Sequence, residues 1–340
     1  METTVTPKSK TEVCIEIELS PEELLRYKEK AVEDLAKGLR VEGFRPGKVP
    51  HDIARAKLGE EAILVEAADK AVNDNYSKTI QEREIEVVGE PDVSVLSLKE
   101  GEPFRFQVSV AHIPPFDLPD YQKIASLCAR KEVVVEESEI DRALEWLQKN
   151  RAGENETLPL LTDEFAQSLG QFSSLSELKE SVGEGLKQEK EMQETDRLRQ
   201  DILERIGEET AIELPPVLIE REQRAMLDRV KYGVQAQLNI SFEDYLEKMK
   251  KTEEQLLESM REDARKRAVN YLVLREISKR EQIAPTKEEI EKEEEVILSQ
   301  YRGEKKGQKT LDAERVRAYT ESAIRTEKTF CFLEALIKQS

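Results

Sequence analysis

The first third of the chain changes its hydrophobic period twice, which predicts a strand, then helices, then strands again. Residues 11–19 alternate apolar and polar side chains, as expected of a strand with one buried face. Ser20, Pro21 and Glu23 follow as an N-cap, a first-turn proline and a capping-box glutamate. A helix therefore begins at this point and continues to about Lys37.

Two more helices and three strands complete this region. We expect a short helix from Asp52 to about Leu58, and a longer one that starts after Gly59 and reaches Ile80. Apolar–polar alternation then returns in three stretches, residues 84–88, 92–98 and 104–111. This order of elements predicts an α+β domain over residues 1–113.

The rest of the chain is predicted to form a linker and a helical domain. Clustered prolines end the first domain, so residues 114–160 form a linker with a short strand and a helix, at 131–135 and 137–150. From 161 to 340 the helical period alone recurs, which predicts an all-α domain with arms. Its expected helices are one or two over 173–205, one from 217 past 230, and others at 242–248, 252–280, from 286, and at 312–337.

Composition favours an elongated, multi-domain protein over a compact enzyme. Apolar residues make up 38% of the 340 residues, charged residues 37% and aromatic residues only 5%. No apolar run is long enough to span a membrane, and no basic-then-apolar leader is present at the N-terminus. We therefore expect a cytoplasmic protein with no membrane partner. The formal net charge of −19 also disfavours a general nucleic-acid binder.

Few side chains are available for catalysis or metal binding. The three cysteines, Cys14, Cys128 and Cys331, lie far apart, each in an apolar or periodic stretch, so buried reduced thiols are expected. His51 and His112 are the two histidines, and neither has partners at metal-ligand spacing. We therefore expect no metal, no cofactor and no catalytic nucleophile with a base beside it.

Two further patterns resemble ligand-binding motifs only superficially. Residues 303–310 are rich in glycine and lysine, but the glycine spacing is not that of a phosphate-binding loop, and a helix rather than a strand precedes them. The acidic runs 253–262 and 288–295 lack the Asp/Asn alternation and the turn glycine of a calcium loop. Residues 303–310 are explained as a surface connection between helices, and the acidic runs as solvated helix faces.

One short loop between two predicted helices carries specific chemistry. Its residues are Gly43, Phe44, Arg45, Pro46, Gly47, Lys48, Val49 and Pro50. Glycine and proline at this density fix a tight exposed turn, which would offer one phenyl ring and two cations to an outside surface. Further cationic side chains lie nearby at Arg40, Arg55 and Lys57, with His51 among them. The alternative is an ordinary helix–helix turn with an exposed phenylalanine.

The loop matches the signature Gly-Phe-Arg-x-Gly-Lys-x-Pro and so resembles trigger factor, a ribosome-associated bacterial chaperone. The order of elements in 1–113 is similar to that family's ribosome-binding domain, and the helical region resembles its back and arms, including the closing pattern 327–333. The resemblance implies docking near the exit tunnel, on ribosomal protein and rRNA, through the 43–50 loop. It also implies binding of unfolded or nascent polypeptides, assistance in protein folding and export, and a homodimer off the ribosome. Pro46 occupies a position where the family often has a cation.

One module of the family is missing. Most members carry an FKBP-type peptidyl-prolyl isomerase domain, but here only the six residues 152–157 separate the linker helix from the re-entry at Leu161–Phe165. A domain of about a hundred residues does not fit there, and Trp146 has no aromatic neighbours that would form such a site. We therefore expect no enzymatic activity. The alternatives are a prolyl isomerase with an unrecognised site and a helical interaction scaffold.

Client binding by such a protein requires dispersed apolar side chains on a rigid frame. Methionine and tyrosine adapt to varied partners. The candidate client contacts are Met226, Leu227, Tyr232, Tyr245, Met249, Met260 and Tyr301, each of which also fits an ordinary core position.

Overall fold

The computed structural model describes residues 1–41, 44, 49–99, 101–151, 158–301 and 313–337, with the side chains of residues 300 and 301 left out. By packing, the chain divides into two compact units. The first combines Met1–Asp117 with Ala211–Val269, and the second combines Leu118–Thr210 with Asn270–Ser340. The sequence predicted three consecutive segments, 1–113, 114–160 and 161–340. The two units do not follow these segments, because helices of the C-terminal region contribute to both units.

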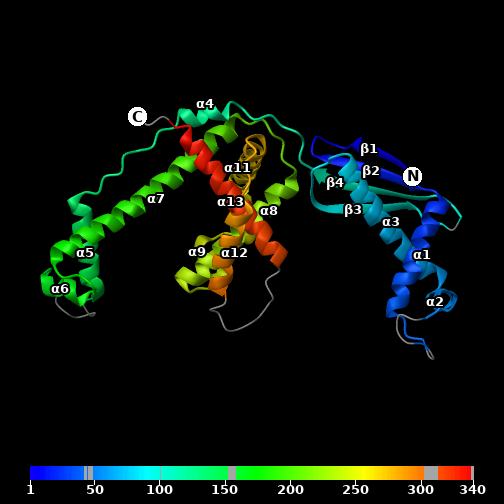
Figure 1. The fold of residues 1–340 in the computed structure, drawn as a ribbon, viewed down its shortest axis with the longest axis horizontal. Coiled ribbons are helices and arrows are strands. Elements are labelled where there is room, and N and C mark those ends of the chain that lie inside the picture. The colour runs from blue at the N-terminus through cyan, green and yellow to red at the C-terminus, as the bar shows by residue number, and fades with distance from the viewer. Residues whose placement is uncertain (42–43, 45–48, 100, 152–157, 302–312, 338–340) are drawn as a thin grey trace. The chain divides into compact units, whose positions relative to one another are not determined.

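The N-terminal part of the first unit is an α+β domain with a four-stranded antiparallel sheet (Figure 1). The sheet has the order β1-β2-β4-β3. Its strands are β1 (Glu2–Pro7), β2 (Glu12–Leu19), β3 (Val87–Ser97) and β4 (Phe104–His112). Three helices, α1 (Pro21–Gly38), α2 (His51–Leu58) and α3 (Glu60–Glu82), lie between β2 and β3 in the chain.

The core of this domain lies between the sheet and its helices. Alternation in β2 buries one side chain in two, and those of Ile15 and Ile17 are 0% exposed. They pair across the sheet with Val108 and Phe106 of β4, and buried alanines of α3 pack against the same cluster. The expected capping box at Ser20 is present. The α+β fold class and the helical remainder are both confirmed.

Two features of the sheet differ from the expectation. Strand β1 was not expected, because its sequence is mostly polar and only Val5 packs against the core. The two strands expected at 84–88 and 92–98 are one strand, β3, whose pairing with β4 is irregular between Val88 and Asp92. Gly89 has a φ of +76° at this irregularity, so the strand bends there instead of ending.

The rest of the first unit is helical. It contains α8 (Pro216–Gly233), the π-helical segment η1 (Val234–Leu238), α9 (Phe242–Met249), α10 (Glu253–Ser259) and the start of α11 (Arg261–Arg280). The single helix expected over 252–280 is interrupted at Met260. The Leu257 carbonyl accepts hydrogen bonds from Gln223 Nε2 of α8 (2.7 Å) and from the Met260 N–H (3.0 Å), and this pattern ends α10.

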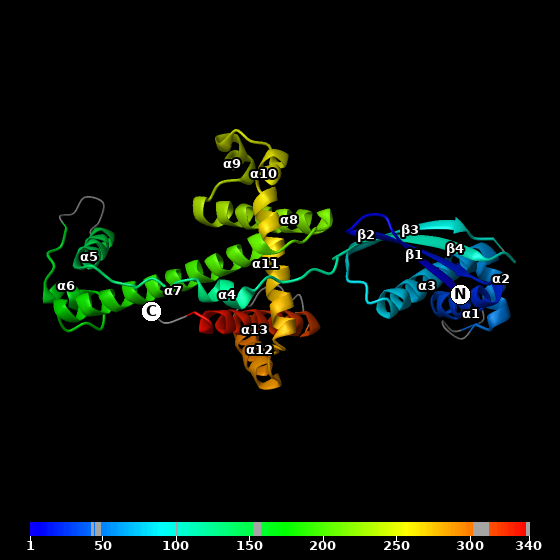
Figure 2. The same ribbon diagram turned by 90° about the horizontal axis from the view of Figure 1, so that it is seen from above.

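The second unit is built on one long helix, α7 (Leu175–Glu209). Near the beginning of α7 lie α5 (Glu137–Arg151) and α6 (Asp163–Ser168), as Figure 2 shows. Leu144, Phe165 and Leu178 form a small separate core there. Gly183 permits this close packing, because a Cβ on it would lie 3.3 Å from Ile140 Cδ1.

The remaining helices of the second unit are α4 (Tyr121–Ser126), the end of α11, α12 (Lys287–Tyr301) and α13 (Ala313–Ala335). The short helix α4 was not expected. Residues 131–135, expected as a strand, form no ladder and instead lie along α7. The Lys131 N–H donates to Glu194 Oε1 (2.7 Å), and Lys190 Nζ donates to the Val134 carbonyl (2.8 Å).

The cysteines and the hydropathy of the helices complete the description. All three cysteines are free thiols. Cys128 is buried and Cys14 half-buried, but Cys331 is exposed, which corrects the expectation of a buried thiol. Its Sγ lies 3.8 Å from Glu327 Oε1 on the polar side of α13. In the described part of the chain, no helix is both long and apolar enough to cross a membrane.

Candidate functional site

The loop of residues 43–50 connects α1 to α2. Phe44 is 39% exposed, and its N–H donates to the Val41 carbonyl (3.1 Å). Pro50 is exposed and precedes α2, with its carbonyl accepting from the Ala54 N–H (2.9 Å). The other predicted residues of the loop, Gly43, Arg45, Pro46, Gly47 and Lys48, lie outside the described residues.

Both ends of this loop are fixed to the core of the α+β domain. Leu39, just after α1, and Val49, just before α2, pack against the buried cluster of the domain. Ala54 on the first turn of α2 is 0% exposed, which anchors that helix. The chain therefore leaves the core at one apolar contact and returns at another, with Phe44 in the segment between them. A ring held in this way is constrained without being covered by its own domain.

The cations near the loop differ in how available they are. Arg40 and Lys57 are exposed and make no ion pair with any residue that the structure describes. Arg55, in contrast, binds Glu60, with its Nε 2.7 Å from Oε1. Hydrogen bonds from Arg55 lower the pKa of the Glu60 carboxyl. Arg40 and Lys57 are therefore the described cations that remain available for an outside anion.

A second set of charges lies on the neighbouring helices. Lys37 and Lys70 both bind Asp34, at 2.5 and 2.7 Å. Their hydrogen bonds lower the pKa of the Asp34 carboxyl to about 2. These lysines are thus held against their own domain by an acid that stays ionised at any physiological pH.

The predicted client contacts fall into different environments. Tyr232 is 78% exposed and Met249 is 46% exposed. Met226, Tyr245 and Met260 are half-buried, and Leu227 is buried at 4% exposure on the inner face of α8. The side chain of Tyr301 lies outside the described part of α12.

Among the exposed apolar side chains that the sequence analysis missed, one directly follows α8. Leu238, at the end of η1, is 56% exposed. The π-helical segment continues directly from α8 and ends at Asn239, whose φ is +51°. Single π-helical turns are frequent at functional sites, but the sequence Val234–Leu238 shows no periodic pattern that would reveal one.

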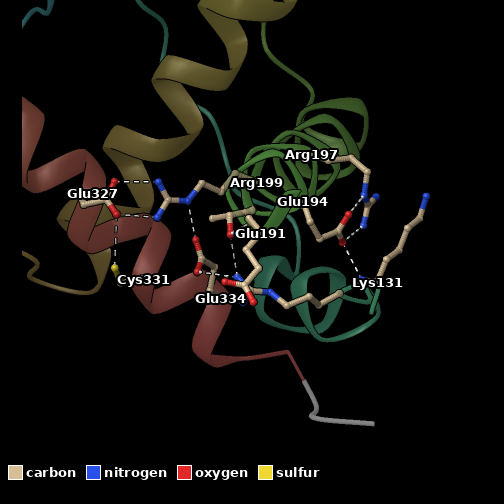
Figure 3. A network of polar contacts seen from close by, with 10 residues as sticks. Lys131, Glu191, Glu194, Arg197, Arg199, Glu327, Cys331 and Glu334 are labelled. Atoms are coloured by element: carbon tan, nitrogen blue, oxygen red, sulfur yellow. Dashed lines mark hydrogen bonds and ion pairs between the residues drawn. The ribbon is translucent and has the colours of Figure 1, made fainter. Parts of the chain in front are cut away.

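The second unit contains a polar network that joins α7 to the last helix, α13 (Figure 3). Arg199 of α7 donates from Nη1 and Nη2 to the two carboxylate oxygens of Glu327 (2.8 and 2.6 Å), and from Nε to Glu334 Oε1 (2.5 Å). Its guanidinium carbon also lies 4.9 Å from the centre of the Phe330 ring. Hydrogen bonds from Arg199 lower the pKa of the Glu327 carboxyl. The network stabilises packing; it has no feature of a reaction centre.

A second part of the same network holds the segment that lies along α7. Glu194 accepts from Arg197 Nε (2.7 Å) and from the Lys131 N–H (2.7 Å). The hydrogen bonds from Arg197 are the main reason that the pKa of the Glu194 carboxyl falls to about 2. Arg197 also donates to the Ala129 carbonyl (3.1 Å). Within the described ranges, no group of three or more His, Cys, Asp or Glu side chains could hold a metal ion.

These features define a class of protein before any comparison is made. A small sheet domain presents an exposed phenylalanine on one loop with free cations, Arg40 and Lys57, on either side of that loop, and a larger helical part presents scattered exposed apolar side chains. Such a combination is typical of a chaperone with a separate docking site.

The comparisons with known proteins identify the family. Residues 1–147 match the family model described as "Bacterial trigger factor protein (TF)", and residues 174–334 match the model of its C-terminus. The chain belongs to the trigger factor family, and it is a ribosome-associated molecular chaperone that assists protein folding.

Relatives and a solved structure agree with this assignment. Trigger factor of Caldicellulosiruptor saccharolyticus is 26% identical, with 88% of this chain and 89% of the relative covered. Trigger factor of Clostridium botulinum is 25% identical, with 97% of each covered. A solved structure, titled "Promiscuous Substrate Recognition in Folding and Assembly Activities of the Trigger Factor Chaperone", has a TM-score of 0.53 at 19% identity. It covers 98% of this chain and 99% of its own, and shows that the fold is the same.

The same comparisons bear on the missing module. Only residues 148–173 lie between the two matched ranges, too few for an isomerase domain. The alignment with the Clostridium relative runs over 422 residues, 82 more than the 340 of this chain, so at least 82 of its residues have no counterpart here. The family matches include no isomerase domain.

Proposed function

We propose that this protein docks on the ribosome through the 43–50 loop, close to the exit tunnel, and holds emerging polypeptides on its helical region. In this proposal it acts in the cytoplasm and has no isomerase activity. The observation that carries the docking proposal is the exposure of Phe44 on a loop whose two ends pack against the domain core.

The chemistry of the loop suggests how docking would work. The Phe44 ring would enter an apolar hollow of a ribosomal protein, because a fixed aromatic anchor loses little conformational entropy when it binds. Arg45 and Lys48, with the unpaired Arg40 and Lys57, would pair with rRNA phosphates or acidic side chains. The net charge of −19 would keep the remainder of the chain away from RNA.

We propose that clients are held by exposed apolar side chains of the helical region. Tyr232 and Met249 fit this role through their exposure, and Leu238 joins them for the same reason. Met226, Tyr245 and Met260 remain candidates with half-covered side chains, and Tyr301 remains a candidate from its sequence alone. Leu227 is left out, because a buried side chain is not available to a client.

Ribosome co-sedimentation tests the docking proposal directly. Replacing Phe44, Arg45 and Lys48 together with alanine should abolish pelleting with ribosomes while the far-ultraviolet circular dichroism spectrum stays unchanged. The matched control replaces Leu25, Arg26 and Lys30 of α1, which are also one exposed apolar side chain, one arginine and one lysine. The control should pellet like the unmodified chain. Equal pelleting of the two triple variants would contradict the proposal.

A salt series tests the electrostatic part of the proposal. Cation contacts with an RNA-rich surface weaken as salt rises, so the pelleted fraction should fall steadily between low and physiological ionic strength. Binding that became stronger at high salt would exclude this contribution. The Phe44 part of the interaction should persist longest.

Two further assays separate the proposal from its alternatives. A short Xaa-Pro peptide should isomerise at the uncatalysed rate in the presence of the protein, and clear acceleration would point to an unrecognised isomerase site. Light scattering of the protein alone tests the proposed homodimer off the ribosome. Saturable binding to one folded protein, together with no binding to ribosomes, would favour the helical interaction scaffold.

A further inference from the structure

Strand β3 is an open edge of the sheet. It is the last strand in the order β1-β2-β4-β3 and pairs with β4 on one side only. Among the described residues, no other strand lies on its second side, and no backbone hydrogen bond joins Val87–Ser97 to an element other than β4. Val217 of α8 lies beside Gly89 near the beginning of the strand. A strand edge of this kind offers a row of N–H and C=O groups that another extended chain can pair with.

The two edges of the sheet differ in their protection. Strand β1 is short, and three of its six residues are threonine, with Pro7 at its end. Polar side chains and proline are usual protections of an edge. In β3 the pairing with β4 is irregular twice, between Val88 and Asp92 around Gly89 and again between Val95 and Ser97. The stretch Asp92–Val95 between these irregularities keeps an unbroken register and is the part of the edge that can accept a partner.

The open stretch of β3 is apolar on the face that carries the core. Val93 pairs with Val108 and Val95 with Phe106, so these side chains share the face of the buried core residues. They are nevertheless 42% and 53% exposed, and Leu96 is 49% exposed. A fifth strand with alternating apolar side chains would cover Val93 and Val95 and extend the core layer by one strand.

The charges beside this edge indicate which strands it would prefer. Glu90 and Asp92 are exposed, and neither makes an ion pair with a described residue. Lys99, beyond the strand, is already bound to Glu102 (3.7 Å). A segment with lysine or arginine next to its apolar positions would therefore be favoured. A second copy of this chain is disfavoured at this edge, because its own β3 carries the same exposed acids, Glu90 and Asp92.

We propose that the Asp92–Val95 edge of β3 binds extended segments of unfolded polypeptide by strand addition, with a preference for alternating apolar residues flanked by basic ones. The inference rests on the proposed client-holding function and adds a second, backbone-directed site to it. Main-chain hydrogen bonds supply affinity that does not depend on sequence, as a chaperone with varied clients requires. The apolar face of β3 then adds a mild preference for segments with alternating apolar residues.

A labelled peptide tests the proposal with the unmodified protein. The probe is a short peptide in which valine alternates with lysine and threonine, and its partner is the same peptide N-methylated at every second amide. Fluorescence anisotropy should show saturable binding of the first peptide and at least about 10-fold weaker binding of the second, because N-methylation removes backbone donors but keeps the side chains. Amide hydrogen exchange of residues 92–95 should slow when the first peptide binds. Equal affinity for the two peptides would overturn the proposal.

Matched variants locate the site. Val93→Lys with Val95→Lys should weaken peptide binding by at least about 10-fold, because lysine blocks strand addition at an edge. The control, Thr4→Lys with Thr6→Lys, adds the same charge to the opposite edge and should change binding less than about 2-fold. Equal loss in both variants would overturn the proposal, as would a concentration-dependent dimer that forms through β3 and excludes the peptide. Neither variant should alter ribosome co-sedimentation, so failure of this site is distinguishable from failure of the proposed docking.

Discussion

The 43–50 loop and the helical region present apolar side chains in opposite ways. Phe44 is one ring on a loop fixed at Leu39 and Val49 to a dense core. Tyr232, Leu238 and Met249 are instead dispersed over a helix, a π-helical segment and a second short helix. A single partner is recognised best by a few fixed groups, whereas many partners require several adaptable ones. Changes at the loop should therefore have large effects, and single changes in the helical region small ones.

The largest effect is expected in the core that supports the loop. Phe106→Ala removes a fully buried ring that stacks with Phe104, at 5.0 Å between ring centres. The free energy of unfolding of the α+β domain should fall by about 3–5 kcal/mol, and ribosome co-sedimentation should fall with it. Chemical denaturation followed by circular dichroism measures the loss. Phe242→Ala, at a half-buried ring in the helical region, is the control and should leave docking intact.

The next effect is expected at the loop itself. Phe44→Ala alone should weaken ribosome binding by about 10- to 100-fold without altering the stability of the domain, because the ring is exposed. Phe44→Tyr should retain most of the affinity, since it keeps the aromatic ring. Titration of labelled protein against ribosomes measures both. Leu25, an exposed apolar residue on α1, provides the control. If Phe44→Ala weakened ribosome binding no more than Leu25→Ala does, Phe44 would not be the single anchor that the comparison requires.

A smaller effect concerns the attachment of α13. Arg199→Ala leaves Glu327 and Glu334 without their shared partner and should lower the stability of the second unit by about 1–3 kcal/mol. The pKa of Glu327 is lowered in the folded state, so its contribution is complete above its unfolded pKa of about 4.3 and is lost as the pH falls through the lower folded value. Urea unfolding at neutral pH and near pH 3 should show this loss in the unmodified chain. In the Arg199→Ala variant the Glu327 contribution to that loss should be absent.

The smallest effect is expected for single changes among the proposed client contacts. Tyr232→Ala should alter suppression of aggregation of an unfolded client by less than about 2-fold, because neighbouring apolar side chains compensate. The combined change of Tyr232, Leu238 and Met249 to alanine should exceed the sum of the single effects. Light scattering of a refolding client measures both. A single substitution that removed the activity would show that the helical region also depends on one anchor.

Local patterns predicted most of the fold, and long-range contacts account for the errors. The capping box at Ser20 and the alternation in β2 require only neighbouring residues, so both were predicted correctly. The break at Met260 depends on Gln223, which lies 34 residues from the carbonyl that it binds. Strand β1 has little apolar character of its own and forms by pairing with β2. Neither cause can be read from a local window of the sequence.

In the candidate site, too, features set by neighbouring residues were predictable and features set by long-range contacts were not. The exposure of Phe44 was predictable, because the flanking glycines and prolines exclude a helix at that position. The burial of Leu227 next to the half-buried Met226 was not, because it depends on which side of α8 faces its neighbours. The Arg199 network joins residues 128 and 135 positions apart. No spacing rule connects such pairs.

The order in which the chain contributes to its two units has a consequence for its own synthesis. The boundary between them is crossed after Asp117, after Thr210 and after Val269. During translation, the first unit is therefore complete only after residue 269 has been synthesised, and the second only after the last helix has been synthesised. This chaperone therefore lacks part of both units for most of its own synthesis. Apolar side chains such as Val93, Val95 and the Leu144 cluster are synthesised long before the units that contain them are complete.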